Sequence, residues 1–345
     1  MRLIERVWRG TDAFGRVARV ALTPVEAAYR AATAARGWLF DHSLLRVHSS
    51  PIPVVSVGNL SVGGTGKTPF AAWLAAELAG SGAEPAVVLR GYGGDEALVH
   101  ARLNPEIPVV IEPRRAEGIR RAAALGATVA VLDDAFQHRA AGRSADVVLV
   151  SAEQWRGSPR LLPAGPWREP LVALRRANVA VITRKTADDH AVSQLAAAIS
   201  DAAPQLPQAV VRFALGELRN ARRRAAGENL PLNAIEGRTL VAIAGIADSN
   251  AFFLQLSESG ADVRPHSFPD HHRYTPGDIT QLLGGERGSQ VMFVCTLKDA
   301  VKLGALWPAT APPLWYVSQA LKVESGGDAI RKLIADLTPT STEGS

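Results

Sequence analysis

The fold of this chain is decided by one stretch of sequence, Val57-Gly58-Asn59-Leu60-Ser61-Val62-Gly63-Gly64-Thr65-Gly66-Lys67-Thr68-Pro69. The stretch follows a short aliphatic run and opens a helical pattern, which is the strand–loop–helix context of a phosphate-binding loop. In such a loop, backbone N–H groups converge on phosphate oxygens and the helix N-terminus adds positive potential. Lys67 is expected to reach the β- and γ-phosphates of a nucleotide, and the hydroxyl of Thr68 is expected to ligate Mg²⁺.

One position departs from the usual form of this loop, because Ser61 stands where glycine is common. The strand, the glycine-rich turn and the Lys-Thr pair together still favour nucleotide binding over a simple glycine turn. The residues expected to contact the nucleotide are Ser61, Val62, Gly63, Gly64, Thr65, Gly66, Lys67 and Thr68.

A second aliphatic run, residues 128–132, ends in the carboxylates Asp133 and Asp134. By itself, an Asp pair at the end of a strand is more often a turn or a helix cap. Next to a phosphate-binding loop, the pair supplies the hard oxygen ligands that Mg²⁺ requires. We therefore expect Thr68, Asp133 and Asp134 to hold Mg²⁺.

Short aliphatic runs alternate with helical stretches from residue 51 onward, which predicts a parallel sheet covered by helices and hence an α/β fold. Expected strands are 53–57, 86–89, 109–111, 128–132, 147–150, 179–183, 240–244, 291–294 and 314–317, and expected helices are 69–78, 116–125, 187–199 and 251–258. Residues 210–215 lead into an extended connector. The length of 345 residues is about twice that of a typical domain. We expect a basic N-terminal segment (1–48), a P-loop domain (49–212), an extended connector (213–236) and a smaller α/β domain (237–345) with a frayed tail from 339.

Composition narrows the class of protein. Hydrophobic residues make up 47% and charged residues 21% of the chain, which excludes a disordered or collagen-like protein. Cys295 is the single cysteine, which excludes an intrachain disulfide and a multi-cysteine zinc or iron–sulfur site. A chain without disulfides suits a reducing compartment such as the cytoplasm.

The positive charge of the chain lies mainly near its N-terminus. Eight arginines against four acidic residues give residues 1–48 a net charge of +4, out of +5 for the whole chain. Apolar side chains such as Trp8, Phe14 and Trp38 lie among these arginines, but no run reaches the ~18 apolar residues of a membrane-spanning helix. The pattern fits helices on an anionic membrane surface or helices packed on the first domain with a solvated arginine face. Elsewhere, basic and aromatic residues do not cluster, which argues against a nucleic-acid partner.

Six blocks of sequence occur in order between residues 51 and 303. They are the loop at 58–69; Arg90-Gly91-Tyr92-Gly93-Gly94-Asp95-Glu96; Asp133-Asp134-Ala135-Phe136-Gln137-His138; Leu161-Leu162-Pro163-Ala164-Gly165-Pro166-Trp167-Arg168-Glu169-Pro170; Phe268-Pro269-Asp270-His271-His272; and Thr296-Leu297-Lys298-Asp299-Ala300-Val301-Lys302. Together these blocks resemble the tetraacyldisaccharide 4′-kinases of lipid A synthesis. The resemblance implies transfer of the γ-phosphate of ATP, with Mg²⁺, to the 4′-hydroxyl of a tetraacyldisaccharide 1-phosphate. It also implies a peripheral enzyme on the cytoplasmic face of the bacterial inner membrane, with two α/β/α lobes that a β-ribbon joins and the active site between them.

The resemblance further implies roles for individual residues. Asp95 would accept the proton of the sugar hydroxyl, and His271 would orient or polarise it from the second lobe. His272 is the adjacent alternative, and His271 is preferred because it directly follows Asp270. The implied catalytic set is Asp95, His271, Lys67 and Asp134; implied contacts to substrate or phosphate come from His138, Arg168 and Glu169; and Thr296, Lys298 and Asp299 are implied near the nucleotide base.

Less specific interpretations remain open for several of these residues. Asp95 fits a carboxylate that caps a turn, and His138 fits a buried histidine bonded to a carbonyl. Arg168 and Glu169 fit a surface ion pair. For the whole chain, the alternative is a P-loop switch or metallochaperone-like NTPase that couples hydrolysis of ATP or GTP to partner binding.

Overall fold

The computed structural model describes residues 3–10, 12–91, 94–222, 229–284 and 291–338. The expected tail from residue 339, Tyr92 and Gly93 of the second block, and residues 223–228 of the connector lie outside the described residues.

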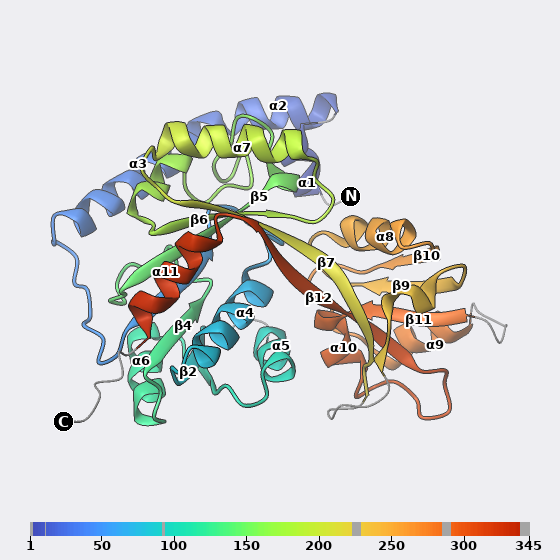
Figure 1. Ribbon diagram of the computed structural model, residues 1–345. Helices are drawn as coiled ribbons and strands as arrows, with labels where there is room; N and C mark the ends of the chain where they lie inside the picture. Colours follow the sequence, from blue (N-terminus) through green and yellow to red (C-terminus); the bar gives the residue numbers. More distant parts are fainter. Residues whose placement is uncertain (1–2, 11, 92–93, 223–228, 285–290, 339–345) are drawn as a thin grey trace, which may run out of the picture.

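One sheet of twelve strands runs through the described part of the chain (Figure 1). Its strand order is β10-β9-β11-β12-β7-β6-β5-β1-β4-β2-β3, and β8 pairs with β7 at the side of this path. The strands are β1 (Val54–Asn59), β2 (Pro85–Leu89), β3 (Val109–Ile111), β4 (Val129–Asp133), β5 (Ala145–Ser151), β6 (Val179–Arg184), β7 (Gln208–Asn220), β8 (Asn229–Leu230), β9 (Thr239–Ala244), β10 (Asp262–Ser267), β11 (Val291–Thr296) and β12 (Leu314–Ser325).

The first lobe is a parallel sheet, β7-β6-β5-β1-β4-β2-β3, with helices on both faces. Because its central strands are buried on both faces, they consist of nearly continuous aliphatic residues, and this allowed their detection in the sequence. The helices of this lobe are α4 (Lys67–Gly80), α5 (Asp95–Leu103), α6 (Arg115–Ala124) and α7 (Asp189–Ala202), with 3-10 turns η1 (Ala152–Gln154) and η2 (Leu171–Arg176). The expected α/β fold with a parallel sheet is confirmed.

The smaller lobe continues the same sheet with β12, β11, β9 and β10 in parallel. Its other elements are η3 (Leu232–Ile235), α8 (Ser249–Glu258), α9 (Pro276–Gly284) and α10 (Leu297–Leu303). β10 was not expected, because it is an edge strand of mostly exposed residues and contains Pro265, so it lacks the aliphatic run that marks a buried strand.

The two lobes are joined by an antiparallel ribbon of two long strands, β7 and β12 (Figure 1). The expected connector at 213–236 contains only part of this ribbon, since its second strand comes from residues 314–325, which the sequence assigned to the smaller domain. Pairing between segments so distant in the chain leaves no local signal in either of them.

The C-terminal helix α11 (Gly327–Leu337) corrects the expected domain of residues 237–345. Its side chains Ile330, Leu333 and Ile334 pack in the same core cluster as Phe70 and Leu74 of α4. The chain therefore crosses to the smaller lobe along β7, returns along β12, and ends on the first lobe.

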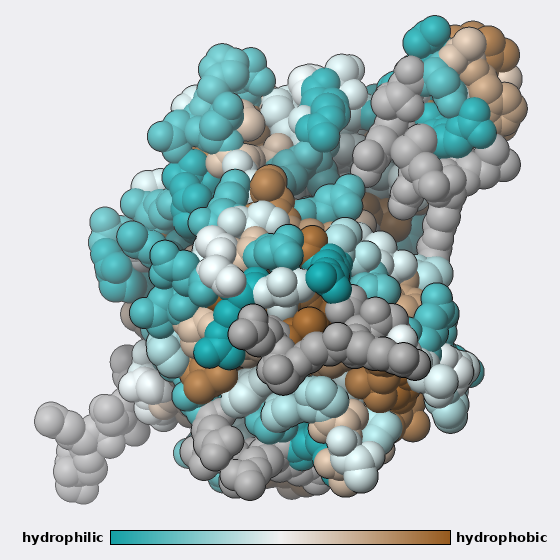
Figure 2. All heavy atoms as spheres, turned by 90° about the vertical axis from the view of Figure 1, so that its right-hand side faces the viewer, coloured by the Kyte–Doolittle hydropathy of each residue, from teal (hydrophilic) through white to brown (hydrophobic). Residues whose placement is uncertain are grey.

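The N-terminal segment forms three helices, α1 (Leu3–Arg9), α2 (Ala13–Ala21) and α3 (Thr23–Asp41), which lie against the first lobe (Figure 1). Trp8 Nε1 donates to the carbonyl of Pro163 at 3.1 Å, so this segment is packed on the protein. It also leaves Phe14, Val17 and Val20 of α2 exposed, and Figure 2 shows hydrophobic residues mixed with hydrophilic ones at the upper corner that the N-terminal helices form. Among the described helices, none has the length and apolar character needed to cross a bilayer.

Replacement of Gly326 tests the turn that returns the chain to the first lobe. Gly326 has φ +69°, and a Cβ there would overlap the carbonyl oxygen of Gln208. Gly326→Ala is expected to lower the free energy of unfolding by at least about 1–2 kcal/mol, the cost of a left-handed residue with a side chain, as measured in urea. Gly80→Ala is the control, because a Cβ at Gly80 meets nothing within 4 Å. Equal stability of the two variants would contradict this account of the turn.

Candidate active site

The phosphate-binding loop connects β1 to α4, as the sequence predicted. Thr65 of the loop is held from two sides: Asn59 Nδ2 donates to its side-chain Oγ1 at 2.9 Å, and Thr183 Oγ1 donates to its backbone carbonyl at 3.1 Å. Gly66 has φ +85°, and a Cβ there would overlap the ring of Phe213 in β7. Glycine is therefore required at this position both by the backbone and by the ribbon that packs on the loop. Ser61, at the unusual position, donates to Gln154 Oε1 at 2.9 Å.

A network of charges surrounds Asp134 at the end of β4. Its Oδ1 lies 3.7 Å from Lys67 Nζ and 2.9 Å from Arg168 Nη2, and Arg168 also contacts Asn59 Oδ1. Burial lowers the pKa of Lys67, and the charge of Asp134 partly offsets that effect. Partial burial raises the pKa of Asp134, but Lys67 and Arg168 outweigh it, so its pKa lies below the usual value. The expected phosphate ligand Arg168 thus already has an anionic partner.

Asp133 lies deeper than Asp134. Its Oδ2 is 3.1 Å from Nε2 of His100, a buried residue of α5, and Arg115 Nη2 donates to the carbonyl of Asp133 at 2.7 Å. Oδ1 of Asp133 is buried without a hydrogen-bond partner among the described residues. An unsatisfied carboxylate oxygen next to the phosphate-binding loop is suited to a cation.

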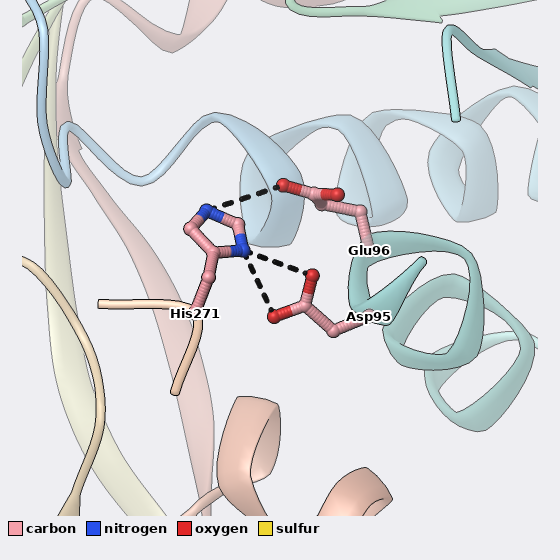
Figure 3. A group of neighbouring side chains, drawn as sticks. All are labelled: Asp95, Glu96 and His271. Carbon is pink, nitrogen blue, oxygen red and sulfur yellow. Dashed lines mark hydrogen bonds and ion pairs between the residues drawn. The ribbon is translucent and has the colours of Figure 1, made fainter. Parts of the chain in front are cut away.

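Asp95 and His271 meet across the two lobes, as the resemblance implied (Figure 3). His271 Nδ1 lies 3.1 and 3.2 Å from the two carboxylate oxygens of Asp95. Asp95 is 3% exposed, with Lys298 Nζ at 3.8 Å and Lys302 Nζ at 3.7 Å, so cations stabilise its negative charge. The side chain of His271 is 42% exposed. His271 therefore presents the accessible face of this pair, and Asp95 lies behind it.

The choice between the two adjacent histidines follows from their partners. His272 Nε2 lies 3.2 Å from Asp278 Oδ2, and its ring stacks on Phe268 within the smaller lobe. Glu96, which follows Asp95 in α5, also points toward the His271 ring, with Oε1 3.9 Å from Nε2 (Figure 3). Burial and the neighbouring Asp95 raise the pKa of Glu96. His271 is thus the histidine of the inter-lobe pair.

A cavity of about 990 Å³ lies between the lobes and brings these groups together. The sequence-predicted residues that line it are Ser61, Val62, Gly63, Gly64, Thr65, Gly66, Lys67, Thr68, Asp133, Asp134, His138, Arg168, His271, Thr296 and Lys298. Asp95 does not line the cavity itself but reaches it through His271.

Two expected residues lie elsewhere. Glu169 pairs with Arg176 at 2.7 Å and does not line the cavity. Asp299 is fully buried, where it accepts from the backbone N–H of Gly245 and the hydroxyl of Tyr274. The alternative interpretation was a surface pair of Arg168 and Glu169, but Glu169 has a different partner, Arg176, and the two side chains are only 16% and 24% exposed.

The N-terminal segment contributes to the site, which the sequence did not indicate. Buried Glu26 of α3 accepts from Arg160 Nε at 2.6 Å and from the N–H of Leu161 at 2.8 Å. The hydroxyl of Tyr29 donates to the carbonyl of Arg168 at 3.1 Å. The loop that carries Arg168 is therefore held by α3.

A parallel sheet, a phosphate-binding loop after its first strand and an acidic end on the neighbouring strand define a P-loop nucleotide-binding protein. The family model for tetraacyldisaccharide-1-P 4′-kinase matches residues 18–338. The chain belongs to this family.

Relatives cover nearly the whole chain. The tetraacyldisaccharide 4′-kinase of Anaeromyxobacter dehalogenans strain 2CP-1 is 38% identical over 95% of this chain and 93% of its own. The enzyme of the same name from Chlorobium limicola is 31% identical over 91% and 96%. The crystal structure of LpxK from Aquifex aeolicus in complex with ATP is similar with a TM-score of 0.71 and 27% identity, over 92% of this chain and 99% of that one.

Glu26→Gln tests the attachment of α3 to the Arg168 loop. The substitution removes the charge that Arg160 and the N–H of Leu161 share, and hydrogen bonds to a charged group contribute about 1.5–3 kcal/mol each. A fall of about 2 kcal/mol in the free energy of unfolding is expected. Thr33→Ala is the control, because the Thr33 hydroxyl bonds only to carbonyls of its own helix. If both variants unfold like the wild type, the buried carboxylate does not anchor α3.

Proposed function

We propose that the protein transfers the γ-phosphate of ATP to the 4′-hydroxyl of a tetraacyldisaccharide 1-phosphate, a step of lipid A synthesis. One observation carries the proposal: the phosphate-binding loop of the first lobe and His271 of the second, bonded to Asp95, line one cavity. The names of the relatives and the ATP complex of the similar structure support the same substrates. A P-loop switch needs no second-lobe pair of this kind, so we do not retain that alternative.

Nucleotide binding is assigned to the loop 61–68. Its backbone N–H groups and Lys67 would hold the phosphates, since the loop is fixed through Thr65 before any ligand arrives. Oδ1 of Asp133, which is buried and has no partner in the described part of the chain, and the hydroxyl of Thr68 at the same cavity fit Mg²⁺, with Asp134 beside them. The ion would neutralise charge on the phosphate oxygens. Lys67 and Arg168 keep Asp134 ionised for this role.

The Asp95–His271 pair is assigned to accept the proton of the sugar hydroxyl. A sugar hydroxyl is a poor nucleophile, so a base within hydrogen-bond reach is needed as the bond to phosphorus forms. His271 faces the cavity and Asp95 behind it holds Nδ1, so we assign the two residues as one unit. This refines the sequence interpretation, in which Asp95 alone received the proton. Because the pair spans both lobes, it forms only when they are close together.

The N-terminal helices are assigned to the surface of the membrane, on the cytoplasmic face of the inner membrane. A substrate with four acyl chains resides in a bilayer, so the enzyme must bind there. The exposed side chains Phe14, Val17 and Val20, together with the arginines of the same segment, fit the interface of an anionic bilayer.

The activity is tested with ATP labelled in the γ-phosphate. The wild type is expected to transfer the label to a chloroform-extractable disaccharide, and Lys67→Ala is expected to lose this transfer while its circular dichroism spectrum is unchanged. Release of inorganic phosphate without labelled lipid would refute the proposed kinase activity.

Asp95→Asn tests the proton-accepting pair. The variant keeps the shape of the side chain but loses its charge, and general base catalysis contributes about 10²–10⁴-fold. A fall of that size in kcat is expected with an unchanged Kd for ATP. Asp278→Asn, which alters the partner of His272, is the matched control and should retain wild-type kcat. A lower ATP affinity with normal kcat in Asp95→Asn would contradict the assignment.

A triple substitution, Phe14→Ser, Val17→Ser and Val20→Ser, tests the membrane surface. Loss of three exposed apolar side chains should reduce binding to anionic vesicles at least tenfold while leaving kcat on detergent-dispersed substrate unchanged. Leu125→Ser serves as control, because Leu125 is equally exposed on the first lobe outside the N-terminal helices. Undiminished vesicle binding would exclude this surface.

A further inference from the structure

The substrate class assigned above carries a phosphate of its own, besides the hydroxyl that is phosphorylated. The family description names this group as the 1-phosphate. The phosphate-binding loop accounts for the triphosphate of ATP, so the cavity must offer positive charge at a second place. The resemblance implied such contacts for His138, Arg168 and Glu169. Of these, Arg168 is held by Asp134 and Asn59, and Glu169 pairs with Arg176 away from the cavity, which leaves His138.

Arg36 of α3 brings another guanidinium to the cavity. Its Nη1 donates to the carbonyl of Gln137 at 3.1 Å, and its Cζ lies 4.9 Å from the centre of the Phe40 ring. These contacts fix the direction of the side chain but leave its charge without a carboxylate among the described residues. A positioned guanidinium with free N–H groups is suited to a phosphate, which it can bind through two hydrogen bonds.

His138 lies in the same loop as Gln137 and lines the same cavity. Its ring is half-buried and has no hydrogen-bond partner among the described residues. Burial, and then the charges of Arg115 and Arg90, lower the pKa of His138. Arg115 itself is engaged with the backbone carbonyls of Val88 and Asp133. The surroundings of His138 are thus positive, and its ring nitrogens remain available to a ligand.

The positions of Arg36 and His138 in the fold are suited to binding a second phosphate group in the same cavity as ATP. Gln137 and His138 follow β4, whose neighbours in the sheet are β1, which leads into the phosphate-binding loop, and β2, which leads toward Asp95. Arg36 belongs to α3, the helix that follows α2 with its exposed apolar side chains, and Trp38 of the same helix is also exposed. Arg36 is therefore part of the N-terminal segment that we assign to the surface of the membrane.

We propose that Arg36 and His138 form the subsite for the phosphate ester that the disaccharide already carries. The inference rests on the proposed kinase activity and names which group of the substrate these residues recognise. An anionic phospholipid headgroup offers the same chemistry, so the test must separate the two sources.

The test combines Arg36→Gln with a substrate that lacks the 1-phosphate, in micelles of a neutral detergent. With the phosphorylated disaccharide, Arg36→Gln should raise the KM for lipid by about 10- to 100-fold, the range of one or two charge-assisted hydrogen bonds. Its kcat and KM for ATP should stay within about twofold of the wild type. With the disaccharide that lacks the 1-phosphate, the KM of the wild type should rise to the value that Arg36→Gln shows with the phosphorylated disaccharide. Arg36→Gln should not raise this KM further. His138→Ala should follow the same pattern.

Two controls make the outcome decisive. Arg30→Gln alters an arginine of the same helix that does not line the cavity and should leave the KM for both disaccharides unchanged. Binding to vesicles of anionic phospholipid without disaccharide should be the same for Arg36→Gln and Arg30→Gln.

An equal rise in KM for both disaccharides, or a loss of vesicle binding specific to Arg36→Gln, would overturn the subsite. Loss of folding would affect both disaccharides equally and is checked by thermal unfolding. Failure of the wild type to label either disaccharide would instead refute the kinase activity itself.

Discussion

The packing of Phe213 on Gly66 is the contact on which the architecture of the active site depends. The ribbon strand β7 lies so close to the phosphate-binding loop that any side chain at residue 66 would overlap the ring. The contact between Phe213 and Gly66 therefore holds the ribbon against the phosphate-binding loop. Because the ribbon leads to the smaller lobe, the same contact sets the position of that lobe relative to the loop. His271 and Lys298 reach the cavity by this route, although 204 and 231 residues separate them from Lys67. The requirement for glycine thus couples nucleotide binding to the geometry between the lobes.

Two residues with side chains adopt left-handed backbone conformations at this cavity, Asp134 with φ 52° and His271 with φ 59°. Such conformations cost about 1–3 kcal/mol and persist where the surrounding contacts determine them. Asp134 is held by Lys67 and Arg168, and His271 by Asp95 and Lys298. Both strained residues thus carry the chemistry assigned to the site.

The sequence predicted the features that local patterns encode. The phosphate-binding loop and the Asp133–Asp134 strand end stand in continuous segments, and the buried strands of the first lobe are aliphatic throughout. Features made by distant segments were missed: the second strand of the ribbon, the return of α11 to the first lobe, and the partnership of His100 with Asp133. Asp95 and His271 were found only through the family resemblance, because nothing local to either residue indicates that they meet. Arg36 was seen only as one basic residue of a basic segment, since its direction is set by Gln137 and Phe40.

The miss of Arg36 belongs to the N-terminal segment, which the sequence analysis treated as separate from the P-loop domain. In the structure, Glu26 and Tyr29 hold the loop of Arg168, Arg168 holds Asp134, and Arg36 lines the cavity. Helix α3 therefore contacts the loop whose Arg168 holds Asp134, a candidate ligand of Mg²⁺. The same helix contributes Arg36 to the wall of the cavity, and it follows α2, whose apolar side chains are exposed. For the proposed kinase this arrangement has a consequence, because the surface assigned to the membrane and the residues assigned to the phosphates belong to one packed unit. Removal of the segment would therefore disturb the site as well as the proposed membrane attachment, and only surface substitutions on α2 can separate the two effects.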